Sequence, residues 1–479
     1  MHRRSLLAGA TVALALAAAP AGAQQRTEIQ FWYGLGGALG ERVQEQVRRF
    51  NESQNQYTVN AQFRGGYVEV MTGAIAAWRA GNPPHIAQVF EVGTATMMAA
   101  GPAIKPVWQL SQETGIAIDP SRYLAGVRGY YSDTQGRLVS MPHNSSSALM
   151  WVNLDAFEKA GITEMPRTWR EVRAAAEKLK AANATPCVMT TTWPTWVMFE
   201  QQSAIHDVAL AKPANGFEGM NVEMNLGDPF FLKHVQFLLD LQKDGLFRYA
   251  GRDNAAGNLF PSGECAIGFG SSAGRAQIER DAKFRWASLP LPYHDDWPGL
   301  NGPSARDTLI AALDPAALTP EQALDALKAI KSASTAPGPR NGVIGGASLW
   351  TLTARNRTPQ EYAAVAAFYA FISRPEEDAW WHQVTGYVPL TTAAYEISRA
   401  QGYYQRNPGA DAAIIQLNRA APTPNSRGFR LGGMVEIRNI IQEELEKALQ
   451  GQQTAQAALE AANRRANVVL RNFERANRS

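Results

Sequence analysis

Apolar and polar positions alternate in three short runs within the first hundred residues. Each alternating run ends in a loop, and apolar residues recur at helical spacing after the first two loops. Such a succession predicts an α/β lobe with a mostly parallel sheet. The expected elements are strands at 27–33, 57–63 and 86–90 and helices at 39–51 and 68–80.

A polar interruption divides the stretch 136–157 into two apolar runs. Residues 144–147 are Asn-Ser-Ser-Ser, and the apolar pattern resumes at 148–152. Buried amides and hydroxyls need hydrogen-bond partners, so this tetrad is poor core material. We interpret the stretch as a strand that crosses between two lobes and turns its polar middle toward a cleft; an ordinary surface turn is the alternative.

The α/β pattern restarts after this crossing, without a detectable sequence repeat. Thr168 is expected to cap a helix, with Glu171 as its capping-box partner. A second lobe of similar architecture follows from these elements. They are helices at 154–160, 168–182 and 231–244 and strands at 187–191 and 264–269.

The last third of the chain is mostly helical. Residues 295–340 are punctuated by Pro and Gly around one helix, expected from the cap Thr319 to about Ser332. Further helices are expected at 361–373, 376–385, 433–449 and 454–473, after a core strand at 341–350.

The length of the chain predicts its number of domains, and its N-terminus predicts its cellular location. At 479 residues the chain is too long for a single core, so two domains are expected. Residues 1–23 combine a basic start, an apolar run of about 14 residues and a small-x-small end, which indicates a secretory signal peptide and a periplasmic location. The Sec route is favoured, although Arg3-Arg4 faintly resembles a twin-arginine signal.

The net charge limits the classes of partner, and the two cysteines raise the question of a disulfide. Arg3 and Arg4 leave with the signal segment, so the mature chain is nearly neutral, which gives no electrostatic case for a nucleic acid or membrane partner. Cys187 and Cys265 form a disulfide or stay as two buried thiols; the sequence leaves both open.

No motif for catalysis or for metal binding stands out, and no metal or cofactor is implied. A hydrolase with distant catalytic residues leaves no local signal and remains an alternative. The histidines of the mature chain are scattered, which favours structural roles. They are His85, His143, His206, His234, His294 and His382.

Small polar groups at loop ends suggest an anion site instead. Ser146, Ser271 and the backbone of Gly346 offer neutral donors, and Arg438 offers a guanidinium; together they suit an oxyanion such as a phosphomonoester. A surface position is the alternative for Arg438.

A polyol has its own expected contacts. Tyr67, Trp193 and Tyr387 offer ring faces or hydroxyls, and Glu91 can accept hydrogen bonds from two hydroxyls. Tyr67 and Glu91 both follow predicted strands, where ligands bind in α/β sheets. Core packing is the alternative for the aromatic residues.

Several segments, in this order, resemble one family. The chain closely resembles the periplasmic sn-glycerol-3-phosphate-binding proteins of ABC importers, within the maltodextrin-type solute-binding family, from about residue 28 to the C-terminus. The segments that carry the resemblance are 90–98 (FEVGTATMM), 129–133 (GYYSD), 144–146 (NSS), 344–350 (IGGASLW), 381–387 (WHQVTGY) and 425–428 (NSRG).

The resemblance implies a ligand set at matching positions. Tyr67 and Glu91 match contacts at the glycerol end, Ser146 and Ser271 match phosphate contacts, and Trp193 matches a wall of the pocket. Gly346, Tyr387 and Arg438 match a backbone donor, a phenol and the anion-pairing guanidinium; Arg427 and Arg430 compete with Arg438 for the last role.

The resemblance also implies a fold, partners and a domain plan. It implies a monomeric two-lobed periplasmic-binding-protein fold that binds sn-glycerol 3-phosphate, with glycerophosphodiesters as further candidate ligands, and delivers the ligand to two transmembrane subunits and a cytoplasmic ATPase. A sugar-binding protein and a periplasmic phosphodiesterase are the alternatives. Residues 295–340 are expected as an insertion on the outside of lobe 1, or over the cleft. Residues 24–141 and about 282–374 are assigned to lobe 1, and 142–281 and about 375–479 to lobe 2.

Overall fold

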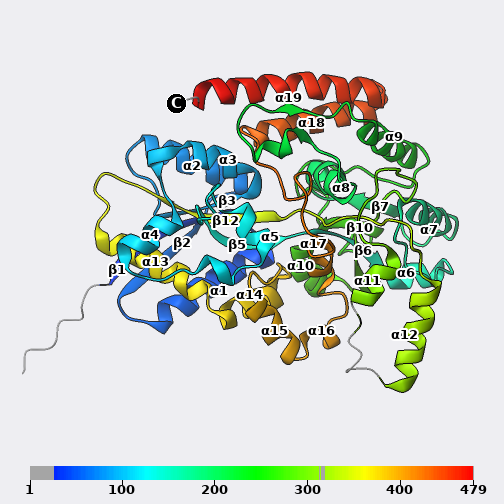
Figure 1. Cartoon of the computed structure of the whole chain (residues 1–479), viewed down its shortest axis with the longest axis horizontal. Helices are drawn as coiled ribbons and strands as arrows, with labels where there is room; N and C mark the ends of the chain where they lie inside the picture. Colours follow the sequence, from blue (N-terminus) through cyan, green and yellow to red (C-terminus); the bar gives the residue numbers. More distant parts are fainter. Residues whose placement is uncertain (1–25, 312, 314–318, 478–479) are drawn as a thin grey trace, which may run out of the picture.

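A computed structural model describes residues 26–311, 313 and 319–477 (Figure 1). The predicted signal peptide, residues 1–23, lies outside the described residues. Within these ranges, no helix has the length and hydropathy that a membrane crossing requires.

A six-stranded sheet forms the centre of lobe 1, on the left of Figure 1. β1 pairs in parallel with β2 and β3, whereas β12 runs antiparallel to β3, β4 and β5. Of these six strands, five therefore run in one direction, as predicted, and β12 runs opposite to them, because the chain re-enters lobe 1 through the second crossing. The strands are β2 (Tyr57–Phe63), β1 (Thr27–Tyr33), β3 (Ile86–Phe90), β12 (Gly345–Leu352), β4 (Ile104–Lys105) and β5 (Met141–Ser146).

Helices cover this sheet. Phe31 of β1 packs in one apolar cluster with Phe50 and Phe368 from two of the helices. The helices of lobe 1 are α1 (Gly37–Ser53), α2 (Tyr67–Arg79), α3 (Thr94–Ala99), α4 (Val107–Thr114), α5 (Ala125–Tyr130), α13 (Pro359–Ile372), α14 (Pro375–Thr385) and α15 (Thr392–Ala400), followed by the short α16 (Tyr403–Arg406).

Lobe 2 is built on a four-stranded mixed sheet. Its order is β11 (Trp286–Pro290), β6 (Ala148–Asn153), β10 (Cys265–Ser271) and β7 (Cys187–Thr191), and only β7 and β10 pair in parallel. A two-stranded ribbon of β8 (Ala211–Lys212) and β9 (Glu223–Met224) is separate. The helices of lobe 2 are α6 (Leu154–Lys159), α7 (Trp169–Ala181), α8 (Gln201–Ile205), α9 (Pro229–Lys243), α10 (Arg275–Asp281), α17 (Ala412–Leu417), α18 (Met434–Leu449) and α19 (Ala455–Asn477).

The two cysteines form a disulfide across the parallel pair β7 and β10. Replacing both by serine is expected to lower the free energy of unfolding by about 2–4 kcal/mol, because the bond closes a loop with a sequence separation of 78 and restricts the unfolded chain. Urea unfolding of the Cys187→Ser/Cys265→Ser variant beside the parent checks this. An unchanged midpoint and slope would contradict it.

The polar tetrad is the first crossing between the lobes. β5 ends at Ser146 in the lobe 1 sheet, and β6 begins at Ala148 in the lobe 2 sheet. The second crossing is residues 341–344, so the strand expected at 341–350 begins only at Gly345. Gln416 joins the two crossings: its amide nitrogen donates to Ser147 Oγ at 2.8 Å, and its backbone carbonyl accepts from Gly342 N at 3.2 Å.

Two segments lie in the opposite lobe from their assignment. β11 pairs with β6, so the chain from about 282 belongs to lobe 2 and not to lobe 1. α14 belongs to lobe 1, because Arg49 of α1 donates to both oxygens of Glu377 at 2.9 and 2.7 Å and Trp381 is buried in the lobe 1 core. The chain returns to lobe 2 near Gly409, whose carbonyl accepts from Ser288 Oγ at 2.9 Å.

The insertion is attached to lobe 2, which corrects its expected place. The Arg340 backbone N–H donates to the Ile205 carbonyl at 2.8 Å, and Asn301 donates to Asp207 at 2.7 Å. Its helices are α11 (Ala305–Ala311) and α12 (Pro320–Ser332), and α12 projects from the lobe 2 side of the molecule (Figure 1). The capping box at Thr168 is present as predicted, and Thr319 caps α12.

Candidate binding cleft

A cavity of about 620 Å³ lies between the lobes and contains every predicted site residue. Both lobes and the first crossing contribute to it. None of the described residues of the insertion lines it, so this described part of the insertion does not form a wall of the cleft. The predicted residues on its walls are Tyr67, Glu91, Ser146, Trp193, Ser271, Gly346, Tyr387 and Arg438.

A buried group of three charges forms one end of the cavity. Arg438 of α18 donates from Nε and Nη2 to the two oxygens of Glu200, at 2.6 and 2.7 Å, and from Nη2 to Glu91 at 2.6 Å. The side chains of Arg438, Glu91 and Glu200 are 10%, 6% and 2% exposed. With both carboxylates ionised, this triad carries a net charge of −1.

Burial and mutual attraction act in opposite directions within the triad. Burial raises the pKa of Glu91, with Arg438 opposing and Glu200 adding to the shift. Burial disfavours the charge of Arg438, but Glu200 and Glu91 overcome it and raise the pKa of Arg438 above its usual range. The guanidinium is therefore permanently charged and already neutralised by protein carboxylates.

Glu200 was not among the predicted residues. It ends a π-helical turn, Trp196–Glu200, and lies 238 positions from Arg438 in sequence. The one available signal is that it is a lone carboxylate at the end of an apolar run, Trp-Val-Met-Phe.

The competing arginines lie elsewhere. The Arg427 and Arg430 guanidiniums each stand 4.4 Å from the ring centroid of Phe217, and neither residue lines the cleft cavity. Arg438 is therefore the one of the three that faces the cleft.

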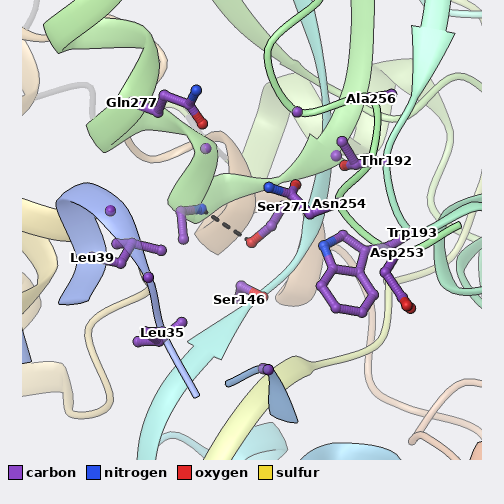
Figure 2. A pocket seen from close by; sticks show the side chains of 18 of the residues that line it. Leu35, Leu39, Ser146, Thr192, Trp193, Asp253, Asn254, Ala256, Ser271 and Gln277 are labelled. Carbon is purple, nitrogen blue, oxygen red and sulfur yellow. Dashed lines mark hydrogen bonds between the residues drawn. The ribbon is translucent and has the colours of Figure 1, made fainter. Parts of the chain in front are cut away.

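Neutral hydroxyl groups occupy the middle of the cavity. Ser146 ends β5, and Ser271 ends β10, where its Oγ accepts from the Ala273 backbone N–H at 3.2 Å. Figure 2 shows that both serines face the same space. Tyr67 and Tyr387 approach each other with hydroxyl oxygens 3.4 Å apart. Burial raises the pKa of Tyr67 to about 12 and that of Tyr387 well above its ordinary value, so both phenols remain protonated donors.

Gly346 permits a close approach of β12 to β5. Its φ is +98°, and a Cβ there would stand 1.6 Å from the Asn144 carbonyl oxygen. Its backbone N–H donates to Glu91 Oε2 at 3.0 Å. The predicted backbone donor is therefore already used to orient the Glu91 carboxylate.

Trp193 is held at the cavity wall by an unusual backbone. Trp193 and Asp253 have φ values of +48°, which side chains other than glycine rarely adopt, and the Trp193 N–H donates to the Asp253 carbonyl at 2.6 Å. Asp253 is a second cavity residue that sequence reasoning missed, together with Thr192, Asn254 and Gln277 (Figure 2).

The described residues contain no group of three or more His, Cys, Asp or Glu side chains suited to a metal ion. Glu91, which lines the cavity, and Glu200, which lies behind Arg438, share this one arginine. The arrangement is suited to binding: neutral donors beside a fixed acceptor group.

Comparisons with known proteins agree with this geometry. The model of the family "Bacterial extracellular solute-binding protein" matches residues 35–379. The sn-glycerol-3-phosphate-binding periplasmic protein UgpB of Rhizobium meliloti is 39% identical over 450 residues, 94% of this chain and 95% of the relative. UgpB of Yersinia pseudotuberculosis is 39% identical over 461 residues, 96% and 95% of the two chains.

Solved structures show the same fold. UgpB from Mycobacterium tuberculosis, in complex with glycerophosphocholine, superposes with a TM-score of 0.73 at 20% identity, covering 94% of this chain and 99% of that one. Maltose-bound MalE3 of T. maritima has a TM-score of 0.70 at 16% identity, covering 92% and 99%. The predicted two-lobed α/β fold is confirmed.

Proposed function

The chain belongs to the bacterial extracellular solute-binding proteins, the binding components of importers and not enzymes, and from this premise we propose that its cleft captures sn-glycerol 3-phosphate. The relatives at 39% identity are periplasmic proteins named for that ligand. We further propose that residues 1–23 direct export, and that a monomer delivers the ligand to two transmembrane subunits driven by a cytoplasmic ATPase.

The observation that carries this proposal is a cleft in which neutral hydroxyl donors face a carboxylate–arginine triad. A phosphate dianion would be repelled by the net negative triad, whereas four hydroxyls can donate to its oxygens. We therefore place the phosphate at Ser146, Ser271, Tyr67 and Tyr387.

The glycerol hydroxyls then lie at the triad. Glu91 accepts from them, Arg438 can donate to them while Glu200 holds it in place, and Trp193 covers the carbon chain. In this proposal Arg438 orients and donates to hydroxyls, which replaces the phosphate-pairing role expected from the resemblance. Tyr67 likewise contacts the phosphate in place of the glycerol end. Because both lobes supply contacts, the bound ligand favours the closed form.

Ligand titration tests the function. We expect calorimetry to show binding of glycerol 3-phosphate and weaker or no binding of glycerol and maltose. Binding of maltose without binding of any organophosphate would favour the sugar-binding alternative. Turnover of a phosphodiester, measured with and without a divalent metal, would favour the phosphodiesterase.

Ser146→Ala tests the assigned phosphate position. It is expected to weaken glycerol 3-phosphate binding about 10- to 100-fold, since a hydrogen bond to a charged group contributes about 1.5–3 kcal/mol. Ser140→Ala is the matched control, because Ser140 is equally buried and does not line the cavity. Equal affinities of the two variants would contradict the assignment.

A further inference from the structure

A second cavity, of about 520 Å³, lies between the lobes and shares no lining residue with the cleft. Gly346 and Tyr387 line the cleft, whereas their near neighbours in sequence, Ile344 and Val388, line the second cavity. The crossing region therefore separates the two cavities, and we call the second one the hinge groove. Its lining comes mainly from residues 124–134, 341–344 and 414–430.

The floor of the hinge groove is apolar and buried. Val127 of α5 and Val388 belong to lobe 1, and Val343 and Ile344 belong to the second crossing; each of the four is at most 6% exposed. Leu417 of α17 continues this apolar surface into lobe 2. Hydrocarbon that covers this floor is removed from water by both lobes at once.

Two arginines lie beside this floor. The Arg427 and Arg430 guanidiniums pack against the same ring, that of Phe217, and all three residues line the groove. Arg430 Nη2 donates to the Tyr130 and Ser132 carbonyls of lobe 1 at 2.9 and 2.8 Å. Among the described residues, Arg427 has no hydrogen-bond or ion-pair partner, and Arg430 has no carboxylate partner. Two like charges therefore share one ring, and an anion would relieve their repulsion.

The acidic residues that line the groove do not neutralise these arginines. Asp133 accepts from the Arg137 backbone N–H at 3.0 Å and from Arg137 Nε at 2.8 Å, so both of its oxygens are engaged. Burial lowers the pKa of Arg430, and Arg427 adds to this shift while Asp133 opposes it. Glu218 is exposed and forms no ion pair with a described residue.

These features select an anion with an apolar body. Paired guanidiniums suit the oxygens of a carboxylate or a phosphate, whereas an ammonium group would be repelled and an alcohol would leave the two charges uncompensated. At roughly 30 Å³ for each non-hydrogen atom, the groove holds at most about 17 such atoms. A carboxylate with a chain of about eight carbons fits within this limit.

We propose that the hinge groove binds a small organic anion with an alkyl chain, whose head group pairs with Arg427 and Arg430 and whose chain covers the apolar floor between the lobes. This site goes beyond the proposed function, because it is separate from the cleft and recognises hydrocarbon in place of hydroxyl groups. Since both lobes form the groove, its occupant is also linked to the arrangement of the lobes.

Calorimetry with butyrate, hexanoate, octanoate, octanol and octylamine tests the groove. The affinity for the carboxylates is expected to rise about 3- to 4-fold with each added methylene group. Octanol and octylamine are expected to bind at least about 10-fold more weakly than octanoate, because neither can pair with the guanidiniums. Saturating glycerol 3-phosphate is expected to leave octanoate bound, since the two cavities are separate.

Two substitutions with opposite effects locate the head group. Arg427→Gln is expected to weaken octanoate binding about 5- to 20-fold through loss of a charge-assisted hydrogen bond. Glu218→Gln is expected to tighten it about 2- to 3-fold, because a like charge is removed. Arg79→Gln on α2 is the matched control and should leave the affinity unchanged, since Arg79 is exposed, lines neither cavity and has no partner among the described residues.

Several results would overturn the site. They are equal affinities for octanoate and octanol, no increase with chain length, displacement of octanoate by glycerol 3-phosphate, and equal octanoate affinities of Arg427→Gln and Arg79→Gln. Absence of binding by every carboxylate would also overturn it. None of the three substitutions changes a residue that lines the cleft, so glycerol 3-phosphate binding by the same variants tests the proposed function separately.

Discussion

Replacing Arg438 with alanine is expected to lower the free energy of unfolding by about 3–5 kcal/mol and to weaken glycerol 3-phosphate binding by about 2–5 kcal/mol. The stability loss follows because Glu91 and Glu200 would remain buried without the guanidinium that neutralises both. The binding loss follows because the glycerol end would lose a donor and the fixed position of Glu91. Urea unfolding and calorimetry measure the two effects.

Acid and a triple variant separate charge from packing at this position. Burial already raises the pKa of Glu91 and Arg438 opposes that shift, so without Arg438 this carboxylate takes up a proton more readily, and the stability deficit of Arg438→Ala should shrink as the pH is lowered from 7 to 5.5. Arg438→Met with Glu91→Gln and Glu200→Gln should recover much of the stability of the parent, since replacing buried paired charges by uncharged groups of similar size is often neutral. A deficit below 0.5 kcal/mol in Arg438→Ala, about the size of an ordinary surface change, would contradict the assigned triad.

Acidification below pH 6.5 is expected to destabilise lobe 2 by up to about 4 kcal/mol per pH unit. The reason is a buried cluster of three histidines, His206, His234 and His294. Burial lowers the pKa of His206 to about 3, that of His294 to about 4, and that of His234 well below its ordinary value. In the unfolded chain all three titrate near 6.5, at about 1.4 kcal/mol per pH unit each.

The direction of this effect follows from proton uptake. Below pH 6.5 the unfolded chain binds protons that the folded lobe excludes, so the free energy of unfolding falls as the pH falls, until the folded-state pKa values are reached. The contacts explain the exclusion. His206 Nδ1 lies 2.7 Å from the Gln202 carbonyl, and its Nε2 accepts from the His294 backbone N–H at 2.9 Å, so an added proton would face a donor.

Neighbouring side-chain charges also shift the pKa of His294 in this cluster. Lys233 lowers the pKa of His294 further, whereas Asp296, which is paired with Lys233 at 2.7 Å, opposes the shift. Urea unfolding between pH 7 and pH 4.5 measures the slope. His234→Gln should reduce the slope by about 1.4 kcal/mol per pH unit, and equal stability at pH 7 and pH 5 would contradict the prediction.

Local sequence signals located most secondary structure. Alternation at 27–33 and 57–63 corresponds to β1 and β2 with the same bounds, and the Thr168 capping box starts α7 as expected. These features depend on contacts within a few residues, so they can be recognised in one segment. The polar tetrad at 144–147 belongs to the same class, because buried hydroxyls between two apolar runs require a polar surrounding.

The resemblance to a family identified residues that no local signal would bring together. All eight predicted site residues line one cavity, although Tyr67 and Arg438 are more than 350 positions apart. The resemblance assigned contacts residue by residue, and for that reason it did not include Glu200, a residue that acts through Arg438.

Local signals did not predict which lobe β11 and α14 join. Nothing within residues 286–290 or 375–385 indicates which lobe they join, because β11 is placed by hydrogen bonds to β6 and α14 by an ion pair with Arg49 and by burial of Trp381. The pairing of Cys187 with Cys265 depends likewise on the register of β7 against β10.

The sequence of this protein therefore specifies its strands, its helices and the chemical character of its cleft through short-range patterning. The charge state of the cleft depends on long-range packing. From the sequence, Arg438 is expected to have a guanidinium free to pair with an anion. In the fold this guanidinium is neutralised by two carboxylates from distant segments, because a buried charge must be compensated.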